Sequence, residues 1–182
     1  MGEIMTKTAF IFPGQGAQYV GMGKDFVENF PKARLVFEEA SDSLGYDMLK
    51  LVMEGTDEDL KQTEVTQPSI LTASIAALAA VTQEGFDCDF TAGLSLGEYS
   101  ALVKAGSLKF KDAVSVVSRR GKFMQEAVPA GRGAMAAVIG MPIDKLKESL
   151  KQASVHGIVE LANFNSHEQL VISGETAGVE AA

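Results

Sequence analysis

The feature that most constrains this chain is a serine flanked by glycines where a strand gives way to a helix. Residues 93–97 are GLSLG, which has the form G-x-S-x-G. A run of β-favouring residues, 89–94, leads into it, and a helical pattern over 98–105 follows at once. Such a turn needs small neighbours, because the strand and the helix approach each other closely there. The pattern predicts an α/β fold with Ser95 at the edge of a parallel sheet.

The remainder of the first 130 residues is mostly helical in pattern. A buried strand is predicted over 8–12, and it ends at the glycine-rich loop 13–23. Helices are predicted over 24–30, 31–44, a short acid-rich stretch capped by Thr56, 68–84, 98–105 and 111–128, with Pro129 ending the last. Only two parallel strands are evident, although such a sheet needs several. Residues 1–130 are therefore expected to be the N-terminal part of a larger subdomain.

The order of predicted strands and helices changes after Gly131. Strands are predicted over 134–139, 158–164 and 169–173, with helices over 142–153 and 175–182. This β-α-β-β-α order gives five of the six elements of a ferredoxin-like split βαβ unit, and the closing strand is missing. Residues 131–182 are expected to be an incomplete ferredoxin-like subdomain. The whole chain is expected to be the N-terminal portion of a longer one.

Composition narrows the classes of protein. The 182 residues are 46% hydrophobic and 22% charged, which is typical of a globular domain, and the net charge of −8 argues against nucleic acid as a partner. The apolar run 70–81 is too short to cross a bilayer of about 30 Å, and no secretory signal is evident. The single cysteine, Cys88, favours a reducing compartment. A soluble, cytoplasmic protein with no membrane partner is expected.

Ser95 is the candidate nucleophile. Its hydroxyl would project at the positive end of the following helix, where the backbone N–H of Leu96 can bind a developing oxyanion. The alternative is a purely structural turn. A serine nucleophile needs a base, and the two histidines, His156 and His167, lie in predicted turns after residue 131. The base is therefore either unusual or absent from these residues.

The glycine-rich loop after the first strand does not fit a nucleotide site. Counting G-x-G-x-x-G from Gly14 puts Tyr19 at the last position, and the Gly23-Lys24 pair is followed by Asp25 where a P-loop has Ser or Thr. In hydrolase-like sites a loop in this place supplies the second oxyanion donor, which would be Gln15. A plain tight turn is the alternative.

Arg119 and Arg120 lie on the helix predicted over 111–128. Most arginines are solvated surface charges. A guanidinium can, however, hold a carboxylate through two parallel hydrogen bonds. The pair is therefore a candidate anion site.

Several stretches together resemble the malonyl-CoA:acyl carrier protein transacylase family. They are 12–18 (FPGQGAQ), 66–68 (TQP), 92–102 (AGLSLGEYSAL), 120–121 (RG), 124–125 (MQ), 163–166 (NFNS) and 171–174 (VISG). The resemblance implies an α/β-hydrolase-like parallel-sheet subdomain carrying a ferredoxin-like insert. It implies that Ser95 carries the malonyl group as an ester and that the backbone N–H groups of Gln15 and Leu96 form the oxyanion hole. Arg120 would bind the free malonyl carboxylate.

The resemblance also implies the partners. Asn165 and Met124 would line the substrate site, malonyl-CoA would be a substrate, and no metal or other cofactor would be needed. The acceptor would be the phosphopantetheine thiol of acyl carrier protein, in fatty acid biosynthesis. Because that carrier is acidic, a local basic patch is expected to dock it, with candidates Lys104, Lys109, Lys111 and Lys122.

Two departures from the family pattern stand out. Leu94 precedes the serine where many members have histidine, and little effect is expected. The family's catalytic histidine belongs to a segment that follows the insert, beyond residue 182, and neither His156 nor His167 matches it. Only residual catalysis is therefore expected of these residues alone.

Three alternatives remain open. The first is a serine esterase or thioesterase, with water as the acceptor. The second is an acyltransferase domain fragment of a polyketide synthase. The third is a non-catalytic binding module. The response of activity to loss of Arg120 distinguishes the first from a malonyl transferase.

Overall fold

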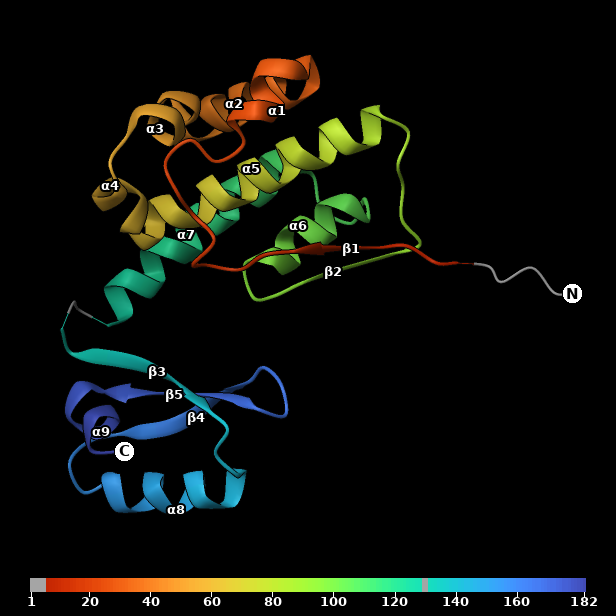
Figure 1. Cartoon of the computed structure of the whole chain (residues 1–182). Coiled ribbons are helices and arrows are strands. Elements are labelled where there is room, and N and C mark those ends of the chain that lie inside the picture. Colours follow the sequence, from red (N-terminus) through yellow and green to blue (C-terminus); the bar gives the residue numbers. More distant parts are fainter. Residues whose placement is uncertain (1–5, 129–130) are drawn as a thin grey trace, which may run out of the picture. The chain divides into compact units, whose positions relative to one another are not determined.

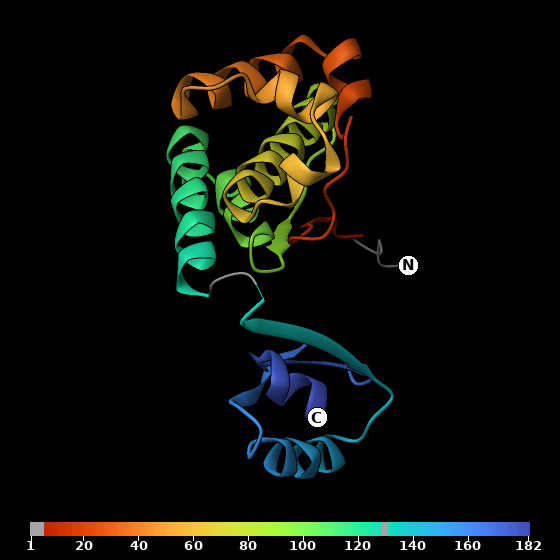
Figure 2. The same ribbon diagram turned by 90° about the vertical axis from the view of Figure 1, so that its left-hand side faces the viewer.

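The computed structural model describes residues 6–128 and 131–182. It separates into two compact units, residues 1–124 and 125–182, which are treated in turn. Figure 1 shows the elements of both, and Figure 2 shows them from the side. The chain is a mixed α/β protein, as its sequence predicts, and Pro129 lies outside the described residues.

The sheet of the first unit consists of two parallel strands in the described residues. Strand β1 is Ala9–Phe12 and strand β2 is Phe90–Gly93, and the pairing runs from Ala9↔Phe90 to Phe12↔Gly93. Both strands confirm the sequence prediction. Helix α6 (Gly97–Lys104) packs against both of them (Figures 1 and 2). The strand, the turn and the helix at Ser95 are therefore consecutive, as the G-x-S-x-G pattern requires.

The helices of the first unit largely follow the prediction. In chain order they are α1 (Lys24–Asn29), α2 (Pro31–Leu44), α3 (Met48–Glu54), α4 (Asp57–Lys61), α5 (Thr63–Gln83), α6 and α7 (Phe110–Ala127). Helix α3 was not predicted. Asp47 caps it, because its carboxylate accepts a hydrogen bond from the N–H of Lys50 at 2.8 Å. Gly55 and Thr56 separate α3 from the predicted helix α4.

The predicted start of helix α5 at Pro68 is wrong, because the helix begins at Thr63 and contains the proline. A proline near a helix start removes only one backbone hydrogen bond, that to the fourth residue before it, which here is Glu64. By length and composition, with a mean hydropathy of 1.4, α5 could cross a membrane. More than half of that apolar window is buried in the fold, however, so α5 is a core helix.

The core of the first unit lies around α5. This helix packs against α2 and, elsewhere on its surface, against α6 (Figure 1). The buried apolar side chains come from six helices, the glycine-rich loop and the turn at Ser95, and include Phe37, Met48, Val52, Leu60, Leu71, Leu96, Val114 and Val117. Burial on several sides explains why α5 is apolar nearly all round.

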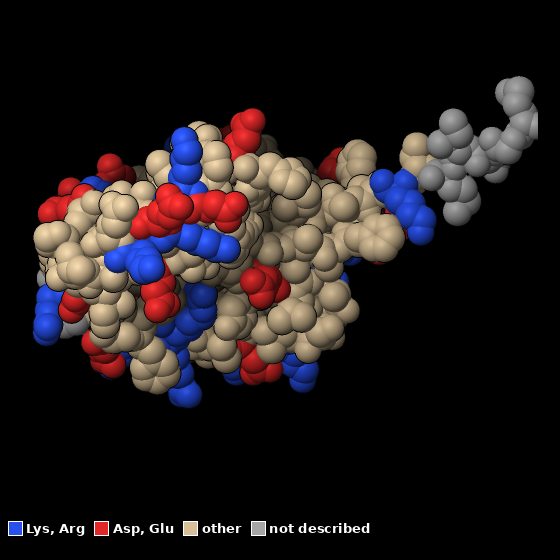
Figure 3. Space-filling view, turned by 90° about the horizontal axis from the view of Figure 1, so that it is seen from below, with Lys and Arg blue, Asp and Glu red and all other residues tan. Residues whose placement is uncertain are grey.

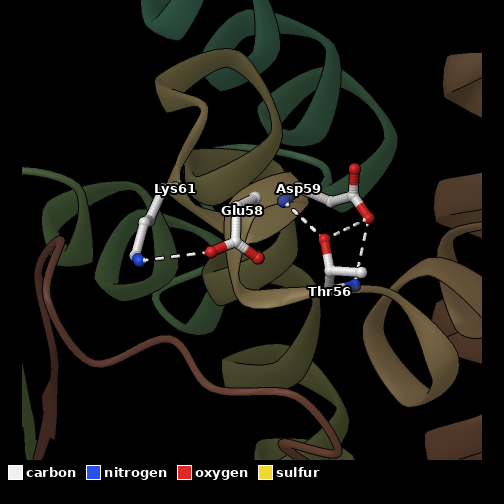
Figure 4. A network of polar contacts seen from close by, with 4 residues as sticks. All are labelled: Thr56, Glu58, Asp59 and Lys61. Carbon is white, nitrogen blue, oxygen red and sulfur yellow. Dashed lines mark hydrogen bonds and ion pairs between the residues drawn. The ribbon is translucent and has the colours of Figure 1, made fainter.

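The start of helix α4 is fixed by a reciprocal pair of hydrogen bonds (Figure 4). The Thr56 hydroxyl accepts from the Asp59 N–H at 3.1 Å, and the Asp59 carboxylate accepts from the Thr56 N–H at 3.0 Å. The Thr56 N–H, together with the Thr56 hydroxyl, which donates to the same carboxylate at 2.8 Å, holds the pKa of Asp59 below its usual value, because both bonds stabilise the ionised form. On the same helix Lys61 lies 3.9 Å from Glu58. The predicted capped, acid-rich helix is confirmed.

The second unit is a three-stranded antiparallel sheet with two helices. Its elements are β3 (Gly133–Ile139), α8 (Ile143–Ala153), β4 (Val159–Phe164), β5 (Gln169–Glu175) and α9 (Thr176–Ala181). The sheet order is β3-β5-β4. The predicted β-α-β-β-α sequence of elements is thus present. Its core contains Leu146, Leu150, Ala153, Val159, Leu170, Ile172 and Val179.

Surface charge on the face drawn in Figure 3 is mixed. Blue Lys and Arg side chains alternate there with red Asp and Glu side chains, and neither sign gathers into a broad patch on the described residues of that face.

Candidate active site

Ser95 has the one positive φ found among the described non-glycine residues, at 51°. This left-handed conformation costs a non-glycine residue of the order of 1–3 kcal/mol, so the surrounding structure must impose it. The neighbouring glycines make it possible. A Cβ on Gly93 would lie 2.0 Å from the carbonyl carbon of Gly97, so the chain reverses with no room for a side chain. The predicted strained turn is therefore present.

The loop after β1 lies directly against this turn. A Cβ on Gly97 would lie 2.3 Å from the Phe12 carbonyl oxygen, and one on Gly14 would lie 2.8 Å from the Leu94 carbonyl oxygen. The Leu94 N–H also donates to the Phe12 carbonyl at 3.3 Å. Gln15 follows Gly14 in the chain, so the glycine-rich loop and the serine turn form one site.

The backbone N–H groups of Gln15 and Leu96 are available to a ligand. Within residues 6–128 and 131–182 neither N–H donates to another group. The Leu96 side chain is only 1% exposed, which anchors the turn in the core. Leu96 also precedes α6, whose positive end favours an anion. The structure thus brings the two predicted oxyanion donors into the region of Ser95.

Arg120 contacts the serine itself. Its Nη2 donates to the Ser95 Oγ at 2.9 Å, and its Nη1 donates to the Gln67 Oε1 at 2.8 Å. Its guanidinium carbon lies 5.8 Å from the centre of the Tyr99 ring. The predicted anion-binding arginine is therefore positioned at the nucleophile, while Arg119 is exposed.

Gln67 is the residue whose role sequence reasoning missed. It belongs to the TQP motif that supported the family resemblance, but no function was assigned to it. Its side chain is 1% exposed, and its Nε2 donates to the Met124 sulfur at 3.2 Å and lies 3.4 Å from the Gln15 Oε1. A polar residue within a long apolar helical run is the signal that points to it, because buried amides need partners.

The remaining predicted site residues fall in different places. Met124 lies at the end of the first unit and touches Gln67. Asn165 belongs to the second unit, where its Nδ2 donates to the Gln169 Oε1 at 3.0 Å. Its role in binding substrate stays a prediction. His156 and His167 are exposed residues of the same unit, in agreement with their assignment to turns.

One candidate docking lysine is already paired. Lys104 binds the Asp87 carboxylate, and its side chain is 18% exposed. The bond raises the pKa of Lys104 and lowers that of Asp87, because each charge stabilises the other. Lys109 and Lys111 are exposed, and docking by them stays a prediction. In the described ranges no three His, Cys, Asp or Glu side chains gather into a possible metal site.

The fold and this site agree with those of one protein family. The family model named "Acyl transferase domain" matches residues 9–182, so the chain belongs to that family.

Curated relatives within this family carry a more specific name. The chain is 52% identical to the malonyl CoA-acyl carrier protein transacylase of Bacillus subtilis, covering 98% of this chain and 56% of that protein. The Escherichia coli K12 enzyme of the same name is 49% identical over 98% of this chain and 58% of its own length. The chain thus spans a little over half the length of the curated relatives it matches.

Solved structures of proteins with the same name are similar to this chain. The transacylase of Clostridium perfringens superposes with a TM-score of 0.91 at 48% identity, covering 97% of this chain and 56% of that one. A malonyl-transacylase determined in complex with a type II polyketide acyl-carrier protein gives a TM-score of 0.91 at 46% identity, with 97% and 57% covered.

Proposed function

We propose that the natural protein containing this chain transfers a malonyl group from coenzyme A to the phosphopantetheine thiol of acyl carrier protein, supplying fatty acid synthesis. The observation that carries the proposal is the hydrogen bond from the Arg120 guanidinium to the Oγ of the strained Ser95. It places a group that binds carboxylates next to a nucleophile. The names of the relatives support the same activity.

The proposed reaction has two halves. The Ser95 Oγ attacks the thioester carbon, and the N–H groups of Gln15 and Leu96 stabilise the oxyanion. The C–S bond then breaks, coenzyme A leaves with a proton as the free thiol, and malonyl remains as an ester on Ser95. In the second half the carrier's thiol attacks that ester, and the serine regains its proton. No metal or other cofactor takes part in the proposed steps.

Arg120 supplies selectivity in this proposal. A malonyl group carries a free carboxylate and an acetyl group does not. The guanidinium would bind that carboxylate and release Ser95 as it does so. An acetyl thioester would leave the guanidinium without its partner, which disfavours the wrong substrate.

The general base is proposed to come from outside the described residues. Both histidines of the chain, His156 and His167, are exposed residues of the second unit. The family resemblance places the catalytic histidine after the position of residue 182. The relatives are long enough to carry such a segment, since the chain covers only 56% of the B. subtilis protein.

The finer fold assignment belongs to the same proposal. We assign residues 1–130 to an α/β-hydrolase-like subdomain and residues 131–182 to a ferredoxin-like subdomain. The parallel β1–β2 pair with its serine turn supports the first, and the β-α-β-β-α order supports the second. A soluble, cytoplasmic location fits the burial of α5 and the lone Cys88.

The intact mass of the natural protein, before and after mixing with malonyl-CoA, tests the function. A gain of one malonyl group that Ser95→Ala abolishes is the expected result. An unchanged mass contradicts the proposal and favours a binding module.

A polyketide role is the second candidate, because the chain matches a malonyl-transacylase solved with a polyketide carrier. Comparing transfer rates to purified fatty-acid and polyketide carriers separates the two. Rapid release of free malonate without a carrier would instead indicate a thioesterase.

A further inference from the structure

Gln67 is a buried amide with every polar end engaged. It lies on α5, yet its partners come from the glycine-rich loop and from α7. Its Oε1 accepts from the Arg120 Nη1, while its Nε2 faces the Met124 sulfur and the Gln15 Oε1. Because arginine can only donate, and both groups at the other end accept, the amide has one satisfactory orientation. It therefore holds Arg120 in a defined place.

A close backbone approach sets this contact. A Cβ on Gly121 would lie 2.4 Å from the Thr63 carbonyl oxygen and 2.7 Å from the Glu64 Cα, so α7 touches the first turn of α5 without a side chain between them. Gln67 lies one turn further along α5, and Arg120 precedes Gly121. The two side chains are thus brought together by the packing of the helices.

The choice of a neutral amide matters for electrostatics. A glutamate at position 67 could accept the same hydrogen bond, but its charge would neutralise the guanidinium. Gln67 fixes the Nη1 of Arg120 without adding a negative charge, and the Nη2 of Arg120 donates to the uncharged Ser95 hydroxyl. An incoming carboxylate then meets an oriented cation that forms no ion pair with any carboxylate in the part of the chain that the structure describes.

We propose that Gln67 is a positioning residue that sets selectivity for acyl groups bearing a carboxylate, by orienting Arg120 without neutralising it. The proposal rests on the proposed function. It extends that function from the residue that binds the carboxylate to the residue that makes this binding possible.

Gln67→Glu in the natural protein is the first test. We expect KM for malonyl-CoA to rise on the order of tenfold to a hundredfold. The new carboxylate competes with that of the substrate for the guanidinium, and a hydrogen bond to a charged group contributes on that order. The much slower reaction with acetyl-CoA should change by less than about threefold, because it makes no use of the guanidinium charge. Gln83→Glu is the matched control, as it adds the same charge at an exposed position of the same helix.

Gln67→Met removes the hydrogen bond without adding charge and is the second variant. It should also lower the ratio of malonyl to acetyl reactivity, but by less than Gln67→Glu. The melting temperature of each variant shows whether its fold persists. If Gln67→Glu or Gln67→Met unfolds, the other variant still tests the proposal.

A double-mutant cycle with Arg120→Ala shows whether Gln67 acts through the arginine. In that background Gln67→Glu should change malonyl reactivity by less than about twofold. Equal effects on malonyl and acetyl substrates, or a full effect without Arg120, would overturn the inference. If the unmodified protein forms no malonyl ester on Ser95, the proposed function itself fails, which is a separate result.

Discussion

The two units of the molecule use the same device, a glycine where backbones touch, for different ends. In the first unit Gly97 lets the serine turn lie against the carbonyl groups of Phe12 and Pro13, at the end of β1. In the second unit a Cβ on Gly174 would lie 2.0 Å from the Ile158 carbonyl oxygen, and one on Gly178 would lie 2.7 Å from that of Gly157. There the close approach only packs β5 and α9 against residues 157–158, which directly precede β4.

The difference lies in what the contact positions. In the first unit the touching backbones bring together polar side chains from separate elements, namely Ser95, Gln67 and Arg120. In the second unit, the touching backbones belong to or adjoin a regular sheet that covers an apolar core. Backbone strain also differs between the two units. The positive φ of Ser95 has no counterpart among the described non-glycine residues of the second unit. Tight packing therefore indicates chemistry only where it gathers polar groups.

Ser95→Gly should have the largest effect and would sharpen this comparison. We expect complete loss of the malonyl adduct together with a gain in stability of about 0.5–1 kcal/mol, because glycine adopts positive φ without strain. Intact mass and urea denaturation measure the two. A loss of stability would show that the turn is not strained.

Leu146→Ala tests whether the second unit depends on its own core. Leu146 is 2% exposed, so the cavity should destabilise that unit by about 2–5 kcal/mol. Amide hydrogen exchange, read separately for α8 and for α5, measures it. Equal loss of protection in α5 would contradict separate cores.

Gly121→Ala and Gly178→Ala form a matched pair, one in each unit. Each added methyl group meets backbone atoms at 2.4 Å and 2.7 Å respectively, and each should destabilise its unit by about 1–3 kcal/mol. Only Gly121→Ala should also slow malonylation of Ser95, because it moves Arg120. Similar slowing by both would remove the proposed division between the units.

Thr56→Ala should have the smallest effect, about 1 kcal/mol of stability, through loss of the cap of α4. The lowered pKa of Asp59 adds a pH dependence. Its stabilisation is present above the unfolded pKa of about 3.9 and is lost as the pH falls through the lower folded value. Urea denaturation at pH 7 and pH 3 should therefore show a smaller penalty for Thr56→Ala at pH 3.

Local structure was predictable from the sequence where a residue type at a given position serves a single structural purpose. The serine turn depends on Gly93 and Gly97, and the α4 cap depends on Thr56 and Asp59, so both were visible. The role of Gln67 was not, because it depends on α5 and α7 touching at a distant glycine. The start of α5 was misplaced because tertiary packing compensates for a proline in the first turns of a helix.

The β1–β2 pairing has a consequence for how the protein is made. The two strands are neighbours in the sheet, yet all of residues 13–89 separates them in the chain. During synthesis at about 5–20 residues per second, β1 waits several seconds for its partner. Contacts this distant in sequence are slow to form, because a long loop must close first. The Ser95 turn packs against the end of β1, so it reaches its final geometry only after this distant pairing has formed.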